Sequence, residues 1–505
     1  MKQTLALFLL LLGLCLEMDA QQKVVRLVHA DNILFDQSLV DAQRLSGNVQ
    51  LEYRGTLFYC DSAYLYANQN FDAFSRIRVI HGSDYNVQGD KLFFNKAENN
   101  SRILGNVILR DNEMTLTSDN LLYNLDTEVA SYVSGGKIVS NKNSNVLTSK
   151  RGSYNAKNET FYFRKNVVLV NKDYTVKSDT LQYNNRTEIS YFFGPTTIVG
   201  DETSIYCENG WYDTKREISQ FNENARVTSK KTVLLGDSIY YDGKKGIGEV
   251  FRNVSIYDTT ADYIISGNYG RYLEKTKESF VTDRALMTQT FDDDTLFLRA
   301  DTLFNFQDTV TDLNTIRAYH DVRIFKKDLQ GLADSLVYAE ADSTIRLFKD
   351  PILWNEENQI TGDSISIRSW QGHMDQLFVR GHSFIISVAD TTNGAIRYNQ
   401  IKGRNTTGYF KENDLYKVRI DGNGQLIYFP AEEKENASKI IGHNRGDCSD
   451  IEIEITDKKI QRIKLLKEPN SVFTPLKMTT ESDYLLEDFK YRGEERPVSK
   501  DSLFK

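Results

Sequence analysis

The chain has 505 residues, of which 40% are hydrophobic, 11% aromatic and 26% charged. This composition is typical of a folded chain and excludes a wholly disordered one. With 62 Lys and Arg against 70 Asp and Glu, the formal net charge of -8 argues against a nucleic-acid-binding protein, which needs a basic surface. Tyr and Phe are abundant and Pro is rare, a balance that favours long β-strands.

Residues 1–20 form a short apolar run with the features of a secretory signal peptide. Lys2 supplies the positive start, residues 5–16 supply the apolar centre, and Ala20 precedes the expected cleavage point. We therefore expect the rest of the chain to function outside the cytoplasm. A lipid anchor on Cys15 is not expected, because Leu14 stands where a lipoprotein signal needs a small residue.

A short pattern then recurs along the chain: Ser or Gly, Asp, any residue, an aliphatic residue, any residue, an aromatic residue. It reads GDKLFF at 89–94, SDNLLY at 118–123, SDTLQY at 178–183, GDSIYY at 236–241 and ADSLVY at 333–338. Twelve copies, some degenerate, follow one another at intervals of 29 to 33 residues between positions 31 and 363. A second pattern lies half a period later, as in SGNVQL at 46–51, LGNVIL at 104–109, RKNVVL at 164–169, FRNVSI at 251–256 and YHDVRI at 319–324.

Both patterns alternate apolar and polar residues, which is the period of a β-strand. The links between them, such as 124–127 and 155–158, are rich in Asn and Asp and are too short for a crossover helix, so they indicate hairpins. Two strands per period predict about 24 antiparallel strands. Gly or Ser in mid-strand predicts a bend or bulge there, so each strand would run across two facing sheets. The sequence thus predicts an all-β, elongated jelly roll or flattened solenoid with its apolar face inward.

The repeat weakens after residue 370, and QIKGRNTTGYF at 400–410 is a degenerate thirteenth copy. We expect an array over residues 21–410, in one or more consecutive units, and a strand-rich cap and tail over residues 411–505. Within the cap, residues 417–429 and 451–466 are predicted to be paired strands. Residues 482–493 are predicted to form a short helix or an irregular tail.

The two patterns in series, at a period of about 29 residues over residues 24–370, resemble the OstA-like family. This family includes LptA, LptC and the N-terminal domain of LptD. The tail, with GDCSDIEIEI at 446–455 and EERPVSKDSLF at 494–504, resembles that of long versions from the Bacteroidetes group. The chain is longer than an LptA-like protein, and with about 135 residues after residue 370 we expect no outer-membrane barrel of the kind that follows this domain in LptD.

The resemblance implies a jelly roll that is V-shaped in section, with an apolar groove that shelters the acyl chains of lipopolysaccharide in the periplasm. It also implies partners: lipopolysaccharide or lipid A, an LptC-like inner-membrane component and an LptD-like outer-membrane barrel. Exposed edge strands would allow end-to-end self-association.

The apolar members of both patterns are the candidates for lining such a groove. In the first pattern they are Leu92, Phe94, Leu121, Tyr123, Leu181, Tyr183, Ile239, Tyr241, Leu336 and Tyr338. In the second they are Val107, Leu109, Val167, Leu169, Val254, Ile256, Val322 and Ile324. The alternative is that the same side chains fill a dry core.

The sequence supports no catalytic or metal site. The six histidines are scattered, and no GxSxG, P-loop or GxGxxG motif is present. The repeated aspartates, Asp90, Asp119, Asp179, Asp237, Asp301, Asp334 and Asp363, are expected to bond backbone amides at turns and bulges rather than to bind cations. Cys60, Cys207 and Cys448 have no zinc-binding spacing, and the sequence leaves open whether two of them form a disulfide. We expect no enzyme, cofactor or metal.

Three functions remain as hypotheses. The first is a periplasmic conduit or chaperone for lipopolysaccharide. The second is a structural or adhesive repeat protein with a fully packed core and no ligand. The third is a β-helix enzyme acting on polysaccharide, which would need parallel coils.

Overall fold

The computed structural model describes residues 24–505 except 36–40, 83–84, 143–144, 230–231, 259–262, 292–293, 371–372, 391–395, 435–436, 458 and 479. The predicted signal peptide lies outside the described residues. The chain divides into two compact units, Met1–Ser219 and Gln220–Lys505, which we call unit 1 and unit 2 and describe separately.

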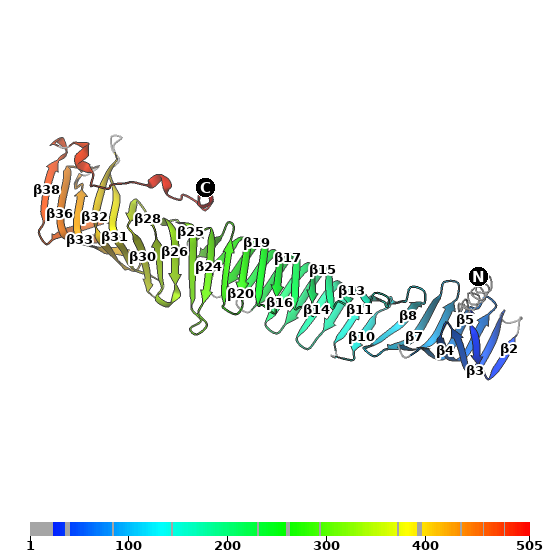
Figure 1. Cartoon of the computed structure of the whole chain (residues 1–505). Helices are drawn as coiled ribbons and strands as arrows, with labels where there is room; N and C mark the ends of the chain where they lie inside the picture. The colour runs from blue at the N-terminus through cyan, green and yellow to red at the C-terminus, as the bar shows by residue number, and fades with distance from the viewer. Residues whose placement is uncertain are drawn as a thin grey trace, which may run out of the picture. The chain divides into compact units, whose positions relative to one another are not determined.

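Both units consist of β-strands, with a few 3-10 turns near the C-terminus (Figure 1). The strands of unit 1 are β1 (Arg26–His29), β2 (Asn32–Phe35), β3 (Ala42–Tyr53), β4 (Thr56–Tyr66), β5 (Phe71–His81), β6 (Tyr85–Asn95), β7 (Asn100–Arg110), β8 (Met114–Asn124), β9 (Val129–Tyr132), β10 (Gly136–Ser140), β11 (Val146–Ser149), β12 (Arg151–Asn155), β13 (Thr160–Val170), β14 (Tyr174–Asn184), β15 (Ile189–Gly200), β16 (Thr203–Asp213) and the start of β17 (Ile218–Ser229).

The strands of unit 2 are β18 (Thr232–Asp242), β19 (Ile247–Asp258), β20 (Tyr263–Leu273), β21 (Glu278–Thr282), β22 (Leu286–Thr290), β23 (Thr295–Arg299), β24 (Thr302–Gln307), β25 (Asn314–Lys326), β26 (Leu329–Ala339), β27 (Thr344–Phe348), β28 (Ile352–Asn355), β29 (Asn358–Thr361), β30 (Ser364–Trp370), β31 (His373–Asp390), β32 (Arg397–Lys411), β33 (Asp414–Tyr428), β34 (Ala431–Lys434), β35 (Ala437–Ile440), β36 (Gly442–Thr456), β37 (Lys459–Leu466) and β38 (Asn470–Pro475). The 3-10 turns are η1 (Glu340–Asp342), η3 (Leu476–Met478), η4 (Glu481–Tyr484), η5 (Gly493–Glu495) and η6 (Asp501–Phe504).

The prediction of an antiparallel all-β fold is confirmed, because consecutive strands such as β6, β7 and β8 pair in antiparallel ladders. This pairing is incompatible with the parallel coils of a β-helix. The predicted number of strands is wrong: the described residues hold 36 paired strands in addition to the β34–β35 hairpin, not about 24. Several long strands split in two at the bend, as β9 and β10 do while both pair with β8, and strands continue beyond residue 411.

A two-residue bulge lies in the middle of about every second long strand, where the sequence predicts a bend. In β7, Gly105 (φ +76°) and Asn106 (φ +44°) are both left-handed. The ladder with β8 passes directly from Leu104 to Val107 and skips these two residues. Gly47-Asn48 in β3 and Arg252-Asn253 in β19 are also left-handed, and the ladders skip them and resume at Val49 and Val254. The predicted bulges are therefore confirmed at these positions.

The two sequence patterns touch each other at the bulge. The Asn106 side chain donates a hydrogen bond from Nδ2 to Oδ2 of Asp90 on β6 (2.9 Å). A Cβ at position 105 would collide with the same carboxylate, so glycine is required there by space as well as by φ. The same Asn–Asp pair recurs as Asn48 with Asp31 and as Asn253 with Asp237.

Other repeated aspartates also bond side chains rather than the backbone amides that we expected. Asp334 pairs with His320 and Lys349, and Asp363 pairs with His382. The side chain across the bulge is the nearest donor, because the bulge turns it toward the neighbouring strand. The repeated carboxylates thus tie one strand to the next.

Each bulge divides a strand into halves that lie in two facing layers. We call one layer the tyrosine arm, after the pattern that ends in Tyr (for example 120–124), and the other the valine arm, after Val-x-Leu (for example 107–110). Their side chains meet: the rings of Tyr53 on the valine arm and Phe94 on the tyrosine arm lie 5.0 Å apart. Buried residues of both arms form the core of unit 1.

The predicted strands of the C-terminal part are confirmed, since β33 pairs with β36 and β36 with β37. The predicted start of the cap, residue 411, is the last residue of β32; the domain boundary itself stays a prediction. Cys60, Cys207 and Cys448 are free and buried. Among the described residues, no helix is long and apolar enough to span a membrane.

The collision at the bulge yields a stability prediction. Gly55 (φ +75°) has open space around it, whereas Gly105 (φ +76°) faces Asp90. Gly55→Ala should cost about 1–2 kcal/mol for the left-handed backbone alone. Gly105→Ala should cost about 2–4 kcal/mol, because overpacking adds to that strain. Urea unfolding of both variants, followed by circular dichroism, measures the difference. Adding Asp90→Ala should recover part of the loss in the Gly105→Ala variant and none in Gly55→Ala; equal losses in the two single variants would contradict this account.

Candidate functional site

The predicted lining residues all lie on inward positions, and none is exposed. Eleven of them are buried: Leu92, Phe94, Val107, Leu121, Val167, Leu181, Ile239, Val254, Val322, Ile324 and Leu336. Nine of these lie beside the bulges, whereas Phe94 and Ile324 lie nearer to the tips of the arms. The other seven are half-buried and also lie nearer to the tips: Leu109, Tyr123, Leu169, Tyr183, Tyr241, Ile256 and Tyr338. At most of the candidate positions burial therefore decreases from the bulge toward the tips.

In unit 1 this space is a cavity of about 240 Å³ between the two arms. The structure brings three of the predicted residues together in its wall: Leu109, Leu121 and Tyr123. The other fifteen candidates do not line it. Most of the wall is aromatic or aliphatic, with contributions from Phe58, Tyr85, Val87, Ile103, Met114, Leu116, Tyr132, Ile138, Tyr154, Phe161 and Phe163.

Several of these wall residues were missed by the motif search. Tyr154 occupies the last position of a degenerate copy of the first pattern, SKRGSY, and that position was its signal. Phe161 and Phe163 belong to neither repeated pattern. Their alternation along β13 predicts a strand but does not identify them as cavity residues. Tyr85 reaches the cavity from the valine arm, and its ring lies 5.8 Å from that of Tyr123.

The cavity wall is electrically neutral where tyrosines form it. Burial raises the pKa of Tyr123, Tyr132 and Tyr154 above the ordinary value, so these phenols keep their protons at neutral pH. Carboxyl side chains lie at the rim, where Asp111 and Glu128 belong to the turns at the tips of the arms. An apolar chain is therefore favoured inside and a polar group at the rim.

The size of the cavity limits what it can hold. An apolar protein cavity of ~150 Å³ accommodates a benzene ring, so a cavity of about 240 Å³ has room for roughly ten carbon atoms. At ~0.8 kcal/mol per buried methylene, this many carbons gain several kcal/mol before the cost of immobilisation. The space fits a segment of one acyl chain and is too small for a whole lipid A molecule.

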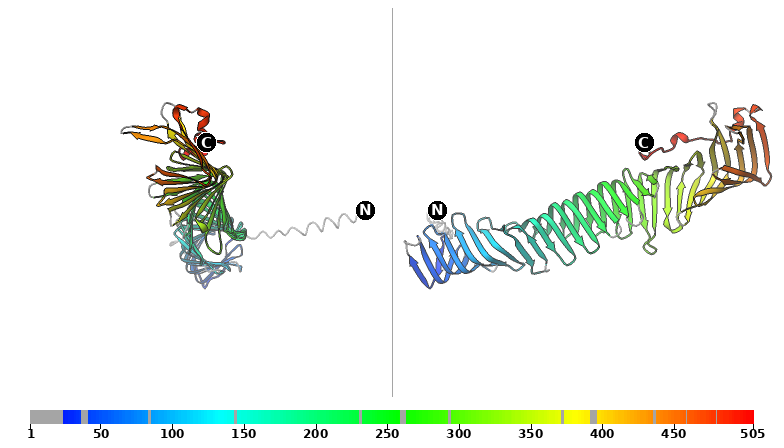
Figure 2. Two further views of the ribbon diagram at one scale, coloured as in Figure 1. Left: turned by 90° about the vertical axis from the view of Figure 1, so that its left-hand side faces the viewer. Right: turned by 180° about the vertical axis from the view of Figure 1, so that it is seen from behind.

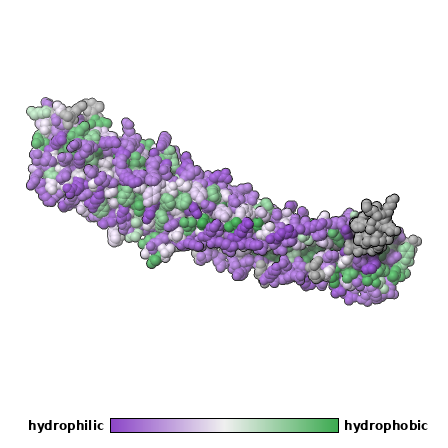
Figure 3. All heavy atoms as spheres, viewed as in Figure 1, coloured by the Kyte–Doolittle hydropathy of each residue, from purple (hydrophilic) through white to green (hydrophobic). Residues whose placement is uncertain are grey.

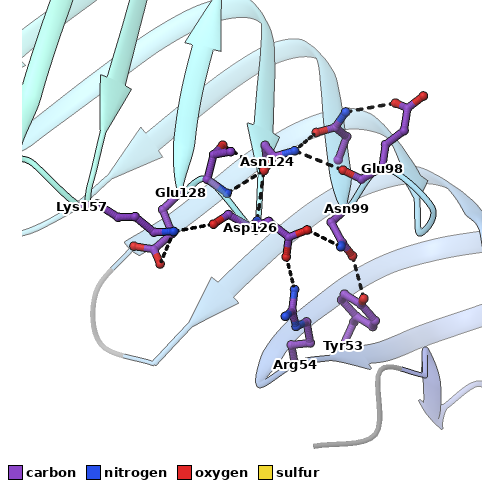
Figure 4. A network of polar contacts seen from close by, with 10 residues as sticks. Tyr53, Arg54, Glu98, Asn99, Asn124, Asp126, Glu128 and Lys157 are labelled. Atoms are coloured by element: carbon purple, nitrogen blue, oxygen red, sulfur yellow. Dashed lines mark hydrogen bonds and ion pairs between the residues drawn. The ribbon is translucent and has the colours of Figure 1, made fainter.

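A polar network, which we call the Asp126 clasp, joins the tips of the two arms on one side of the cavity (Figure 4). Arg54, in the β3–β4 turn of the valine arm, donates from Nη1 to Oδ1 of Asp126 in the β8–β9 turn of the tyrosine arm (2.7 Å). Asn99 Nδ2 donates to the other carboxylate oxygen (2.6 Å), and Tyr53 Oη donates to Asn99 Oδ1 (2.7 Å). Lys157 Nζ donates to the main-chain oxygen of Asp126 (2.6 Å). The hydrogen bond to Asp126 raises the pKa of Arg54, so this cation keeps its charge.

A second contact between the arms, the Glu113 clasp, lies further along unit 1. Asn185 Nδ2 in the β14–β15 turn donates to Glu113 Oε2 in the β7–β8 turn (3.2 Å), and Lys142 Nζ pairs with Glu113 Oε1 (2.6 Å). The hydrogen bond from Lys142 lowers the pKa of Glu113, so the carboxylate stays ionised at neutral pH. Between the two clasps, Tyr85 on the valine arm and Tyr154 on the tyrosine arm border the cavity.

The described residues contain no group of three His, Cys, Asp or Glu side chains placed to hold a metal ion. The arrangement offers an apolar space with polar groups at its rim.

Two consecutive stretches, residues 21–179 and 180–292, match the family described as OstA-like protein. Together they cover more than half of the chain. The chain belongs to the OstA-like family. Residues 265–372 also match a family described as LptA/(LptD N-terminal domain) LPS transport protein. The first OstA-like match contains the whole cavity and most of both clasps.

Among solved structures, the chain is similar to LptH of Pseudomonas aeruginosa, described as the LptA homologous periplasmic component of the conserved lipopolysaccharide transport device. The two are 16% identical, over 19% of this chain and 75% of that chain, with a TM-score of 0.19, which carries no structural argument. No curated protein sequence matches this OstA-like chain.

The Asp126 clasp should control access to the cavity more than it controls stability. The side chains of Arg54 and Asp126 are 28% and 51% exposed, so breaking their pair with Arg54→Ala should cost at most about 1 kcal/mol. The variant should nevertheless take up the apolar dye N-phenylnaphthylamine several-fold faster in stopped-flow fluorescence. Arg76→Ala is the matched control, because Arg76 pairs with Asp61 at a bulge, away from the tips of the arms. Equal uptake by the two variants would refute the gating role.

Proposed function

We propose that this chain shelters acyl chains of lipopolysaccharide between its two arms during transport to the outer membrane. The observation that carries the proposal is the apolar cavity of unit 1, which lies within the part of the chain that matches the OstA-like family. The family matched by residues 265–372 is described as an LPS transport protein, which supports the same substrate. In this proposal the chain binds and releases lipid and catalyses no reaction.

The distribution of burial supports a conduit rather than a single deep pocket. Near the bulges the arms pack against each other, whereas half-buried residues such as Leu169 and Tyr183 continue the apolar lining toward the tips. Because successive repeats present chemically similar side chains, a lipid would meet many sites of similar affinity. It would be held without being trapped at one of them.

The proposed location is the periplasm, where a leader at residues 1–20 would deliver the chain. For partners we propose an LptC-like component and an LptD-like barrel. β1 and β2 both pair with β3, and all four residues of β2 are exposed. Hydrophobic residues gather on the visible surface at this end of unit 1 (Figure 3), and Ile33, Leu34 and Phe35 are each more than half exposed. An edge of this kind favours pairing with a strand of another protein or of a second copy.

Photo-crosslinking in living Gram-negative cells tests the proposal. A photoreactive amino acid in place of Tyr123 or Phe161 should give adducts that react with antibody against lipopolysaccharide. Tyr162 is the control, because it follows Phe161 on β13 but is exposed on the other side of the strand. Adducts at Tyr123 and Phe161 but not at Tyr162 are expected. A folded, exported chain that gives no lipid adduct at either inward position would favour the fully packed repeat protein instead.

Filling the cavity should weaken lipid binding without unfolding the protein. Ala130 lines the cavity and pairs with Tyr123 and Tyr154 on the neighbouring strands. Ala130→Phe should reduce the yield of lipid adduct at Phe161 at least several-fold, because the new ring occupies the space. Leu122→Phe places the same ring on β8 at an exposed position that does not line the cavity, and should leave the yield unchanged. Similar losses in both variants would contradict the assignment of the cavity as the lipid site.

A further inference from the structure

The C-terminal segment of unit 2 follows a path of its own. After β38 the chain runs back along the strands of unit 2 toward β25 (Figures 1 and 2). We call residues 483–505 the C-terminal strap. The main-chain hydrogen bonds described for it either close local turns, as from Phe489 N to Leu486 O (3.2 Å), or join it to side chains of the array. The strap is therefore not a strand of the ladder.

The strap covers a row of residues on the outer face of the valine arm. Eight neighbouring strands each contribute one residue to this row, and each residue pairs directly with the one on the next strand. We call these residues the outer row: Phe297, Phe325, Gln330, Trp354, Gln359, Ile386, Gln400 and Ile427. The neighbouring positions Ile385, Ile401 and Leu426 belong to the core between the arms, so the outer row points away from it.

Six of the eight residues of the outer row are buried although the row lies outside the core between the arms, and Phe297 and Phe325 are half-buried. Trp354, Gln359 and Ile386 are each 1% exposed, and Gln400 and Ile427 are fully buried. Apolar and amide side chains on the outer face of a sheet need a cover to reach this burial. The strap supplies part of this cover through Tyr484, Leu486 and Phe489, and Phe429, Ile440 and Leu476 supply the rest around Ile386 and Ile427.

Two buried glutamines of the row hold the strap by its main chain. Gln400 donates from Nε2 to the oxygen of Tyr484 (2.6 Å), and its Oε1 accepts from the nitrogen of Leu486 (2.8 Å). Gln359 makes the same pair of bonds with the oxygen of Lys490 (2.8 Å) and the nitrogen of Arg492 (2.7 Å). Each glutamine amide donates to one main-chain oxygen and accepts from the main-chain nitrogen two residues later. A neighbouring β-strand would offer the main chain the same pair of hydrogen bonds. This recognition does not depend on the side chains of the strap.

Side chains of the strap supply the selective contacts. Leu486 is 5% exposed and Leu503 is fully buried. The rings of Phe489 and Tyr491 lie 5.4 and 4.9 Å from that of Tyr398. A third glutamine of the row, Gln330, accepts from Arg496 Nε (2.6 Å). Along the strap, main-chain contacts with Gln400 and Gln359 are therefore interspersed with side-chain contacts made by its apolar residues and by Arg496.

One contact under the strap is incomplete. The indole Nε1 of Trp354 is buried and has no hydrogen-bond partner among the described residues. An unpaired buried donor lowers stability relative to a state in which water reaches it. Departure of the strap would hydrate this group and would break none of the ladder hydrogen bonds.

We propose that the outer row of unit 2 is a binding site for an extended peptide, and that the C-terminal strap is its resident, releasable ligand. The glutamines bind any extended main chain, and the apolar contacts select this segment. The occupant to which the proposal commits is the strap of the same chain. The proposal is independent of lipid binding in unit 1.

Cutting the folded full-length chain tests the proposal. A protease recognition sequence is inserted after Met478, which is 79% exposed, and the chain is cut after folding. We expect the strap to stay bound through size-exclusion chromatography. A fluorescent synthetic peptide of residues 481–505 should then exchange with it, with saturable kinetics, while the circular dichroism of the β-sheet remains unchanged. The uncut chain should bind little of the peptide.

Variants identify the groups that hold the strap. Gln359→Ala combined with Gln400→Ala should accelerate exchange about a hundredfold or more, since four hydrogen bonds are lost. Gln376→Ala is the matched control, because Gln376 bonds Arg368 on β30 and not the strap, and it should leave the rate unchanged. A strap that never exchanges, or whose release unfolds unit 2, would overturn the proposal by showing that it is an integral part of the fold. Release without rebinding of the peptide would overturn it as well.

Discussion

The two-residue bulge in the middle of about every second long strand is the constraint on which the rest of the structure depends. A straight strand lies in a single sheet. The bulge at Gly105 and Asn106 bends β7, so that its two halves lie in two facing layers. The carboxylate of Asp90 on the preceding strand binds Asn106 and leaves no room for a side chain at position 105. Because a bulge recurs at the same place in successive repeats, the bends align and two arms result within each unit.

The two arms produce a gradient from packed core to open space. Residues beside the bulges, such as Val107 and Val167, are buried and line no cavity. At the tips the arms diverge, and in unit 1 a cavity with neutral aromatic walls remains between them. Clasps centred on Asp126 and Glu113 then join the tips on either side. A carrier of acyl chains needs this combination of apolar shelter, polar rim and restricted access.

In unit 2 the outer face of the valine arm has a second role. The side chains of Trp354, Ile386 and Ile427 would be an exposed apolar stripe if nothing lay over them, and such stripes favour association. The C-terminal strap covers them, and the amides of Gln359 and Gln400 hold its main chain. The inner face of the valine arm thus borders the cavity in unit 1, and its outer face in unit 2 holds the strap.

The sequence by itself determined the local features of this protein: antiparallel strands, bulges before each Val-x-Leu, and the inward direction of all eighteen candidate residues. These follow from periodicity and from residue types that act over a few neighbours. Only the tertiary structure decided which of these residues line a cavity, because that depends on which parts of the two arms face each other. The hydrogen bond between Arg54 and Asp126, 72 residues apart in the sequence, is an example of such a contact. The contact between Gln400 and Leu486 of the strap, 86 residues apart, likewise depends on the tertiary structure. So does the number of strands, because the neighbouring strands decide whether a strand continues through its bend or is divided there into two strands. No local pattern encodes such distant contacts.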